Sequence, residues 1–384
     1  MRRIAILGST GSIGAQALDV AESTEGLEVV ALSAGRRWEE LIEQARLHDV
    51  STVAIADPHS AEQARAAWDG EVLSGDEALA ELISGAEPDL VLNAIVGSAG
   101  LAATVITLSE GIDLALANKE SIVVGGDLVT ELAAATGARL LPVDSEHSAL
   151  YQLLAGERGQ PAGTVQRLTL TASGGPFRGR SRDEMETITV EAALAHPTWQ
   201  MGGKISIDSA TLINKGLEVI EAHHLFAVSY DQIEVVVHPQ SIIHSMISLA
   251  DGSSLAHLGY PDMRVPIAYA LHWPERADLG LKPLDLEQLG ALTFEAVDND
   301  AFPCLGLALA AGRQGGTAPC VLNAANEVAV EAFLSRRCSF LQIGQIIDAT
   351  LDDASYEQSY SFETLIESDR AARELAGRHL AALT

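Results

Sequence analysis

Two acidic motifs that lie far apart in the sequence carry side chains able to bind a divalent metal. Asp144 and Glu146 follow an apolar run, residues 139–143, which predicts a short buried strand. At positions i and i+2 of extended chain their side chains would leave the strand end on one face. Glu218, expected at a helix start, adds a third carboxylate, and three oxygen ligands favour Mg²⁺ or Mn²⁺. Spacing alone also allows a solvated strand end and a helix N-cap, so both interpretations stay open.

A glycine-rich turn near the N-terminus has the context of a dinucleotide site. An apolar strand over residues 4–7 is followed by the turn 8–14 and by an expected helix over 15–21. The spacing is G-x-x-G-x-x-G instead of the usual G-x-G-x-x-G. Small residues still allow backbone N–H groups and the helix N-terminus to approach a pyrophosphate. A tight turn without a ligand is the alternative.

The end of the second expected strand, residues 27–33, indicates which dinucleotide would bind. An NAD site usually has an acidic residue there that binds the ribose 2′-hydroxyl. This chain has Gly35-Arg36-Arg37 instead. Two guanidinium groups suit a 2′-phosphate, so NADP(H) is favoured over NAD(H). Either arginine is also compatible with a solvated surface charge.

Hydroxyl, amide and ammonium groups near the acidic motifs suit a phosphate. Ser209, Asn214 and Lys215 lie close in sequence to Glu218, so a metal-chelating phosphosugar could bridge the two kinds of group. Ser173 belongs to a small-residue turn that would expose N–H groups to an anion, although such turns are usually ordinary loops.

Two further stretches suggest contacts with a substrate. Lys119 follows an expected strand, residues 113–117, at the edge where α/β sheets bind ligands. Trp199 lies in the stretch 196–204, which is interpreted either as a closing lid or as a core anchor beside flexible glycines. The adjacent His223 and His224 would diverge by about 100° on a helix, and we expect them to be structural.

The elements around these residues predict an α/β fold. Strands and helices alternate as far as Asp144, which predicts an N-terminal doubly wound, Rossmann-like parallel sheet in domain 1–144. Residues 145–272 are expected to form an α+β catalytic domain with strands 165–171, 233–238, 243–249 and 254–258. A linker over 273–298 would lead to a bundle-like helical domain, 299–384, in which apolar residues recur at helical spacing.

Composition restricts the partners and the compartment. The chain has 384 residues, is 47% hydrophobic and carries a formal net charge of −29, which argues against nucleic-acid or anionic-membrane partners. Three cysteines without metal-ligand spacing suit a reducing compartment. The apolar stretch at the N-terminus is too short for a signal peptide, and no later run is long enough to span a membrane. We expect a cytoplasmic protein.

Several motifs in order along the chain closely resemble those of the 1-deoxy-D-xylulose 5-phosphate reductoisomerase family. They are Gly8-Ser9-Thr10-Gly11-Ser12-Ile13-Gly14, Asn118-Lys119-Glu120-Ser121, Val143-Asp144-Ser145-Glu146-His147, Asn214-Lys215-Gly216-Leu217-Glu218, residues 238–246, residues 259–264 and residues 322–327. The resemblance covers essentially the whole chain, so it is far more specific than a single glycine turn.

The resemblance implies a role for each matching residue. It implies metal ligands at Asp144, Glu146 and Glu218. It implies substrate contacts at Ser145, Lys119, Ser173, His196, Ser209, Asn214, Lys215 and Glu218. It implies NADPH contacts at Gly8, Thr10, Gly11, Ser12, Ile13, Gly35, Arg36, Arg37, Asn118, Glu120, Gly202 and Met263. The catalytic set it implies is Lys119, Glu146, His147, His196, Trp199 and His244, in which His147 and His244 rank lower.

The resemblance also implies the reaction and the assembly. A divalent metal (Mn²⁺, Mg²⁺ or Co²⁺) would chelate the substrate's carbonyl and hydroxyl groups. The carbon skeleton would rearrange by retro-aldol cleavage and re-addition, and NADPH would reduce the branched aldehyde to 2-C-methyl-D-erythritol 4-phosphate. A homodimer is expected. Departures are slight: the 2′-phosphate stretch is rich in arginine, and Gly203 replaces a residue that is frequently larger.

Two other classes are weighed against this function. A metal-dependent sugar-phosphate isomerase or hydrolase would need the acidic residues but no dinucleotide turn, and the turn at residues 8–14 argues against it. A non-catalytic relative would be expected to have lost a metal ligand or a phosphate donor, and all of these residues are present.

Overall fold

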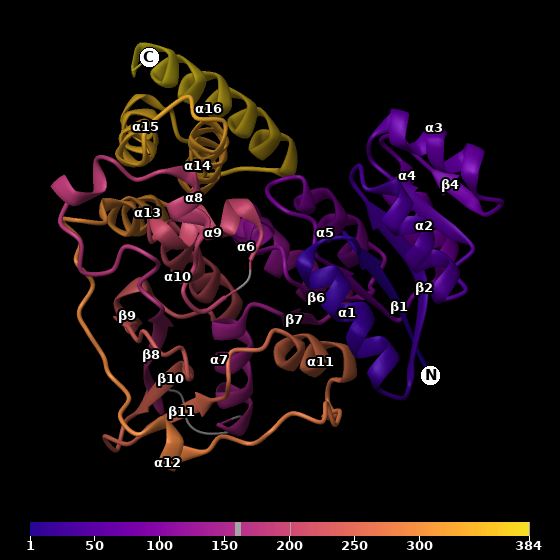
Figure 1. The fold of residues 1–384 in the computed structure, drawn as a ribbon, viewed down its shortest axis with the longest axis horizontal. Coiled ribbons are helices and arrows are strands. Elements are labelled where there is room, and N and C mark those ends of the chain that lie inside the picture. The colour runs from indigo at the N-terminus through magenta and orange to yellow at the C-terminus, as the bar shows by residue number, and fades with distance from the viewer. Residues whose placement is uncertain (158–162, 200, 384) are drawn as a thin grey trace. The chain divides into compact units, whose positions relative to one another are not determined.

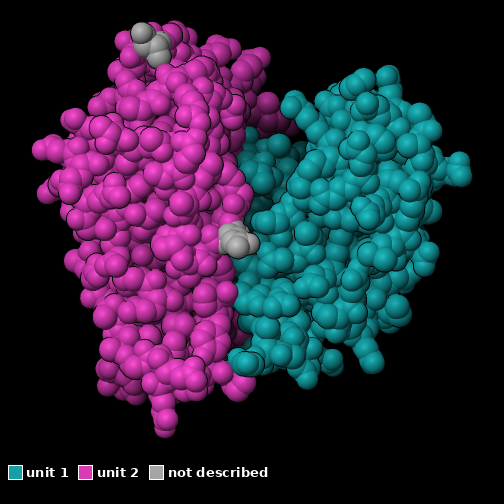
Figure 2. All heavy atoms as spheres, viewed as in Figure 1, with its two compact units in different colours: residues 1–121, 129–148, 262–282 teal, residues 122–128, 149–261, 283–384 magenta. Residues whose placement is uncertain are grey.

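The structure is a computed structural model and describes residues 1–157, 163–199 and 201–383. These residues form two compact units, which are coloured separately in Figure 2. Unit 1 comprises residues 1–121, 129–148 and 262–282, and unit 2 comprises residues 122–128, 149–261 and 283–384. The units are therefore discontinuous in sequence, whereas the predicted domains follow one another along the chain.

Unit 1 contains the predicted doubly wound parallel sheet. Its seven strands have the order β4-β3-β2-β1-β5-β6-β7, and every pairing is parallel (Figure 1). The strand order reverses beside β1, which creates the position at the carboxyl edge where open α/β sheets bind ligands. The strands are β1 (Arg2–Leu7), β2 (Leu27–Ala34), β3 (Thr52–Ile55), β4 (Glu71–Leu73), β5 (Leu90–Asn93), β6 (Asp113–Leu116) and β7 (Leu140–Pro142).

Helices connect these strands, and several were not predicted. The sequence analysis missed β4 and the helices α2 (Trp38–Leu47), α4 (Ala78–Ala86) and α6 (Lys119–Thr136). A late segment, α11 (Arg264–His272), packs against α1, and Arg264 forms an ion pair with Asp19 there. The other helices that begin in this unit are α1 (Ser12–Ser23), α2 (Trp38–Leu47), α3 (Pro58–Ala67), α4 (Ala78–Ala86), α5 (Gly100–Ser109), α6 (Lys119–Thr136) and α7 (Ser145–Gly156).

Unit 2 contains a four-stranded mixed sheet with the order β11-β10-β8-β9. The pair β8–β9 is parallel, and the pairs β10–β8 and β10–β11 are antiparallel. Its strands are β8 (Val165–Ala172), β9 (Ile233–Val237), β10 (Ile243–Leu249) and β11 (Ser254–Leu258). This agrees with the α+β architecture expected for the middle of the chain.

The helices of unit 2 share one large hydrophobic core. Leu217 and Ile220 of α10 are buried in the same cluster as Leu305, Leu322 and Ile343 from the last third of the chain. The C-terminal helices are thus not packed only against one another. The helices are α8 (Val190–Leu194), α9 (Gly203–Ala210), α10 (Ile213–Phe226), α12 (Leu286–Leu289), α13 (Pro303–Gln314), α14 (Ala318–Leu334), α15 (Phe340–Asp353) and α16 (Phe362–Leu383).

Among the described residues, none of the helices combines the length and apolar composition needed to cross a membrane.

Candidate active site

The glycine-rich turn of unit 1 lies between β1 and α1. Gly8 has a φ of +81°, and a Cβ there would approach the carbonyl oxygen of Ala94 to 2.8 Å. Gly8 also accepts the N–H of Gly11 at 2.9 Å, which closes a tight turn. No side chain caps the N-terminus of α1 at Gly11. The first N–H groups of α1 are therefore available to an anion, as a pyrophosphate requires.

Arg36 and Arg37 follow β2 but have different surroundings. Arg37 donates a hydrogen bond to the carbonyl oxygen of Thr10 and forms an ion pair with Glu40 at 3.0 Å. The Arg36 side chain is 87% exposed and lies 3.7 Å from the carboxylate of Asp57. Arg37 thus braces the glycine-rich turn, whereas Arg36 offers an accessible guanidinium group.

Asn118 holds the loop after β5 with its side chain. It is buried, and its Nδ2 donates to the carbonyl oxygens of Ile95 at 2.7 Å and Gly97 at 2.9 Å. Its Oδ1 accepts the backbone N–H of Ser121 at 3.0 Å, which caps α6. The Asn118 amide therefore fixes the backbone from which the side chains of Lys119 and Glu120 extend.

The predicted extended geometry of Asp144 and Glu146 is wrong. The strand β7 ends at Pro142, and α7 begins at Ser145, so Glu146 lies in the first turn of a helix. Oδ1 of Asp144 accepts the N–H of Glu146 at 3.3 Å, and its carbonyl oxygen accepts the N–H of Ser148 at 2.8 Å. Asp144 therefore sits at the N-terminus of α7, where a carboxylate is stabilised by unpaired N–H groups.

Buried cationic and imidazole groups surround Asp144. The Nζ of Lys119 lies 2.5 Å from its Oδ2, and Nδ1 of the fully buried His147 lies 3.3 Å from its Oδ1. Ser145 donates its hydroxyl to the carboxylate of Glu146. Unit 1 thus brings Lys119, Asp144 and His147 together around one carboxylate.

Glu218 lies in unit 2 and in the second turn of α10, and not at the helix start as expected. Its carboxylate is buried and accepts from Nδ2 of Asn214 at 2.5 Å. The buried Lys215 forms an ion pair with the same carboxylate. Leu212, at the N-cap position of α10, provides no side-chain cap, but Oγ1 of Thr211 accepts the N–H of the first helical residue, Ile213, at 3.4 Å. The N-terminus of a helix favours an anion.

Ser173, His196 and Trp199 are connected in unit 2. Nδ1 of His196 accepts the N–H groups of Trp199 at 2.9 Å and Thr198 at 3.2 Å. Its Nε2 must then carry the proton and donate to Oγ of Ser173 at 3.0 Å. Burial lowers the pKa of His196, in agreement with a neutral ring. Oγ of Ser173 also accepts the N–H of Gly175, so its own hydroxyl proton can point to a ligand.

The remaining predicted residues divide between the two units. His244 is buried in β10 of unit 2, with its ring centroid 6.4 Å from that of Trp199. Met263 precedes α11 in unit 1. Gly202 precedes α9 in unit 2, and Gln200 of the predicted lid lies outside the described residues.

The sequence analysis missed a buried carboxylate, Asp208, in α9. It forms an ion pair with Lys204 at 2.8 Å and accepts from Nδ2 of Asn326 at 2.9 Å. The i, i+4 spacing of Lys204 and Asp208 was a possible signal for the ion pair. Asn326 is more than a hundred residues away, and no local pattern indicates that contact.

Family models match three parts of the chain. Residues 4–126 match 1-deoxy-D-xylulose 5-phosphate reductoisomerase, residues 140–226 match the C-terminal domain of that enzyme, and residues 258–375 match the DXP reductoisomerase C-terminal domain. A 1-deoxy-D-xylulose 5-phosphate reductoisomerase of Xanthomonas campestris pv. campestris is 50% identical, with 99% of this chain and 97% of the relative covered. One from Thermosynechococcus vestitus is 47% identical, with 98% and 94% covered.

Solved structures agree with these relatives. A crystal structure of DOX-P reductoisomerase in complex with NADPH, fosmidomycin and magnesium has a TM-score of 0.94 and 42% identity, and the match covers 100% of this chain and 99% of that chain. The reductoisomerase from Zymomonas mobilis in complex with NADPH has a TM-score of 0.89 and 42% identity, with both chains fully covered. The chain therefore belongs to the 1-deoxy-D-xylulose 5-phosphate reductoisomerase family.

Proposed function

We propose that the protein is an NADP-dependent oxidoreductase that converts 1-deoxy-D-xylulose 5-phosphate to 2-C-methyl-D-erythritol 4-phosphate, a precursor in isoprenoid biosynthesis. The observation that carries this proposal is the match to family members at about half identity over nearly the whole chain. Relatives were solved with NADPH and with magnesium, so the same cofactors are assigned here. The sequence predicted the same reaction and cofactors.

We assign the divalent metal, Mg²⁺ or Mn²⁺, to Asp144, Glu146 and Glu218. Carboxylate oxygens are the ligands that these hard cations prefer. Asp144 and Glu218 each lie against a buried ammonium group, Lys119 and Lys215 respectively. When bound, the metal supplies Lewis-acid polarisation of the substrate oxygens.

We assign the substrate phosphate to donors of unit 2. Ser173 has a hydroxyl proton available, Ser209 is partly exposed at the end of α9, and Asn214 and Lys215 lie in the first turn of α10. Helix N-termini, hydroxyl groups and ammonium groups all favour a phosphate. This local cluster would offset the repulsion between a phosphorylated substrate and a chain of net charge −29.

We assign NADPH to the carboxyl edge of the unit 1 sheet. The turn from Gly8 to Ile13 would bind the pyrophosphate, and Arg36 the 2′-phosphate, while Arg37 holds the turn through Thr10. NADPH supplies the hydride. The assignments of Gly35, Asn118, Glu120, Gly202 and Met263 to the cofactor rest on the family resemblance.

The remaining catalytic residues orient groups and exclude water. Lys119 would bind both Asp144 and a substrate oxygen and so fix their relative positions. Ser145 would orient Glu146 through their hydrogen bond. His196 is fixed by Ser173 and by two backbone N–H groups, so it can keep the chain at Trp199 in one conformation. Trp199 would then cover the substrate and exclude water. His147 and His244 are assigned supporting roles.

A homodimer in the cytoplasm is the assembly that we propose. The strand β11 forms an edge of the unit 2 sheet and exposes Leu255 and Leu258. Exposed apolar edge strands favour pairing with another chain, here a second copy. The three cysteines are free thiols, as expected in a reducing compartment. Light scattering would test the dimer, and a Leu258→Glu variant should shift it toward monomer.

The decisive experiment follows NADPH oxidation by chelator-treated protein supplied with 1-deoxy-D-xylulose 5-phosphate. Activity should require added Mg²⁺ or Mn²⁺ and should be lost in a Glu218→Gln variant, which keeps the size of the side chain but removes its charge. The matched control is Glu39→Gln, which removes an exposed carboxylate and should retain activity. Metal binding without NADPH oxidation would reject the redox assignment.

A further inference from the structure

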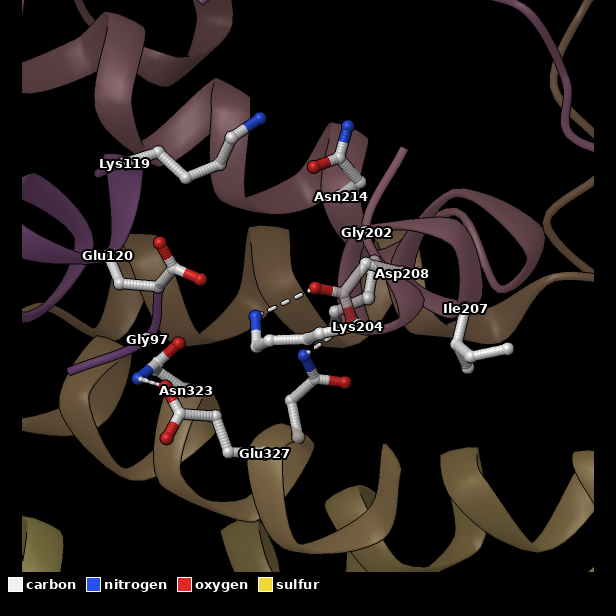
Figure 3. A network of polar contacts seen from close by, with 12 residues as sticks. Gly97, Lys119, Glu120, Gly202, Lys204, Ile207, Asp208, Asn214, Asn323 and Glu327 are labelled. Atoms are coloured by element: carbon white, nitrogen blue, oxygen red, sulfur yellow. Dashed lines mark hydrogen bonds and ion pairs between the residues drawn. The ribbon is translucent and has the colours of Figure 1, made fainter. Parts of the chain in front are cut away.

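Asp208 is a buried carboxylate that joins two helices of unit 2. Its side chain is only 2% exposed. Nζ of Lys204, one turn earlier in α9, lies 2.8 Å from its Oδ2. Figure 3 marks this ion pair with a dashed line. Nδ2 of Asn326, in α14, donates to its Oδ1 at 2.9 Å. The two oxygens of one carboxylate thus bind its own helix and a helix from the last third of the chain.

The Asn326 amide has only one orientation that suits this contact. Its NH₂ group must face the carboxylate, since a carboxylate accepts and cannot donate. The Oδ1 of this fully buried side chain then has no hydrogen-bond partner within the described residues. A buried acceptor without a partner is unfavourable. The chain tolerates this cost at the contact that fixes α9 on α14.

α9 carries a proposed phosphate donor and supports another. Ser209 follows Asp208 directly, near the end of the helix. A Cβ on Gly175 would lie 2.8 Å from the carbonyl oxygen of Ser209, so the turn that contains Ser173 packs closely on the end of α9. Any displacement of α9 therefore moves Ser209 and also moves the turn that contains Ser173.

We propose that Asp208 is a positioning residue for the substrate phosphate. By fixing α9 to α14 through Asn326, it holds Ser209 and the turn at Ser173 in the geometry that binds the phosphate, without touching the substrate. The C-terminal helices thereby contribute to substrate specificity. This inference rests on the proposed assignment of Ser173 and Ser209 to the phosphate.

The test compares Asp208→Asn and Asn326→Ala with the unsubstituted protein. Each variant is assayed for kcat, for the KM values of 1-deoxy-D-xylulose 5-phosphate and NADPH, for calorimetric binding of inorganic phosphate, and for its unfolding midpoint. Both should raise the KM of the phosphosugar and weaken phosphate binding about tenfold, because small misplacements of binding groups are costly. The KM of NADPH should change less than twofold.

The control is Asp113→Asn, which breaks the ion pairs of a largely buried carboxylate of unit 1 with Arg2 and Arg139 and lies outside unit 2. It should lower the unfolding midpoint without changing phosphate binding. A lower midpoint with unchanged phosphate affinity in Asn326→Ala would overturn the proposal, whether or not Asp208→Asn folds. If the unsubstituted protein binds phosphate but does not oxidise NADPH, the proposed reaction fails, and the calorimetric comparison still decides the role of Asp208. If it binds no phosphate, the assignment of Ser173 and Ser209 fails.

Discussion

At the scale of single residues, two of the three proposed metal-binding carboxylates form an ion pair with a lysine of their own unit. Asp144 lies against Lys119, and Glu218 lies against Lys215. All four side chains are largely buried. Removal of one partner from such a pair leaves an uncompensated charge, which is costly.

His244 should make the stability of the protein depend on pH. Burial, assisted by the nearby His257 and His238, lowers its pKa to about 4. Between that value and about 6.5, the unfolded chain binds a proton that the folded chain does not. Stability should therefore decrease as the pH falls through this range, by up to about 3 kcal/mol. In urea unfolding at pH 7 and pH 5, His244→Gln should lose less stability on acidification. The exposed His59→Gln should behave as the unsubstituted protein does.

The two arginines after β2 should have separable effects. Arg36→Ala removes an exposed guanidinium group and should lower the preference for NADPH over NADH by about tenfold or more, with little loss of stability. Arg37→Ala also releases Thr10, and it should weaken the binding of both dinucleotides. The measurement is kcat/KM with each dinucleotide. An unchanged preference in Arg36→Ala would show that the 2′-phosphate binds elsewhere.

At the scale of elements, α6 is interrupted by a kink within its length. Gly126 has φ 47° and ψ −128°, which lie outside the helical region. A Cβ there would approach the hydroxyl of Tyr360 to 2.9 Å and the ring of His224 to 3.1 Å. The next residue, Asp127, forms an ion pair with His224 at 2.8 Å. Only glycine suits both this conformation and this close approach.

Gly126→Ala should therefore destabilise the protein. The added methyl group meets side chains at a backbone conformation that alanine rarely adopts, so we expect a loss of about 1–3 kcal/mol. Gly306→Ala is the matched control, because it lies in α13 with nothing within 4 Å of its added Cβ. It should be neutral or slightly stabilising. Equal unfolding midpoints for both variants would contradict the role of the kink.

At the scale of the whole molecule, the last third of the chain completes the core of unit 2. The cluster that contains Leu217 and Ile220 of α10 also contains Ile343 and Phe333. The helix that carries Glu218 is thus stabilised by segments more than a hundred residues away.

This shared core predicts that the C-terminal helices cannot be weakened without loss of the site. Ile343→Ala removes a fully buried side chain and should cost about 2–5 kcal/mol. The exposed Ile366→Ala should change stability by less than about 0.5 kcal/mol. Thermal unfolding of the two variants tests this difference. If the main cooperative unfolding transition were unchanged in Ile343→Ala, the C-terminal helices would have to unfold separately, as an independent domain.

The sequence by itself determined the elements whose signals are local. The strands Ile243–Leu249 and Ser254–Leu258 were predicted with their observed bounds, because apolar runs and alternation act over a few residues. The glycine turn and the order of the motifs likewise identified the family. The helix α6 was not predicted although Asn118 caps its start, since asparagine is common in turns and a single cap residue does not by itself indicate a helix.

Only the tertiary structure decided how distant groups meet. It placed Glu146 in a helix, separated the tasks of Arg36 and Arg37, and joined Asp208 to Asn326. It also merged the C-terminal helices with α10 in one core. Such contacts depend on the packing of segments far apart in the chain, where periodicity and spacing carry no information. Residue types thus determined the chemistry available to this protein, and packing determined which groups perform it.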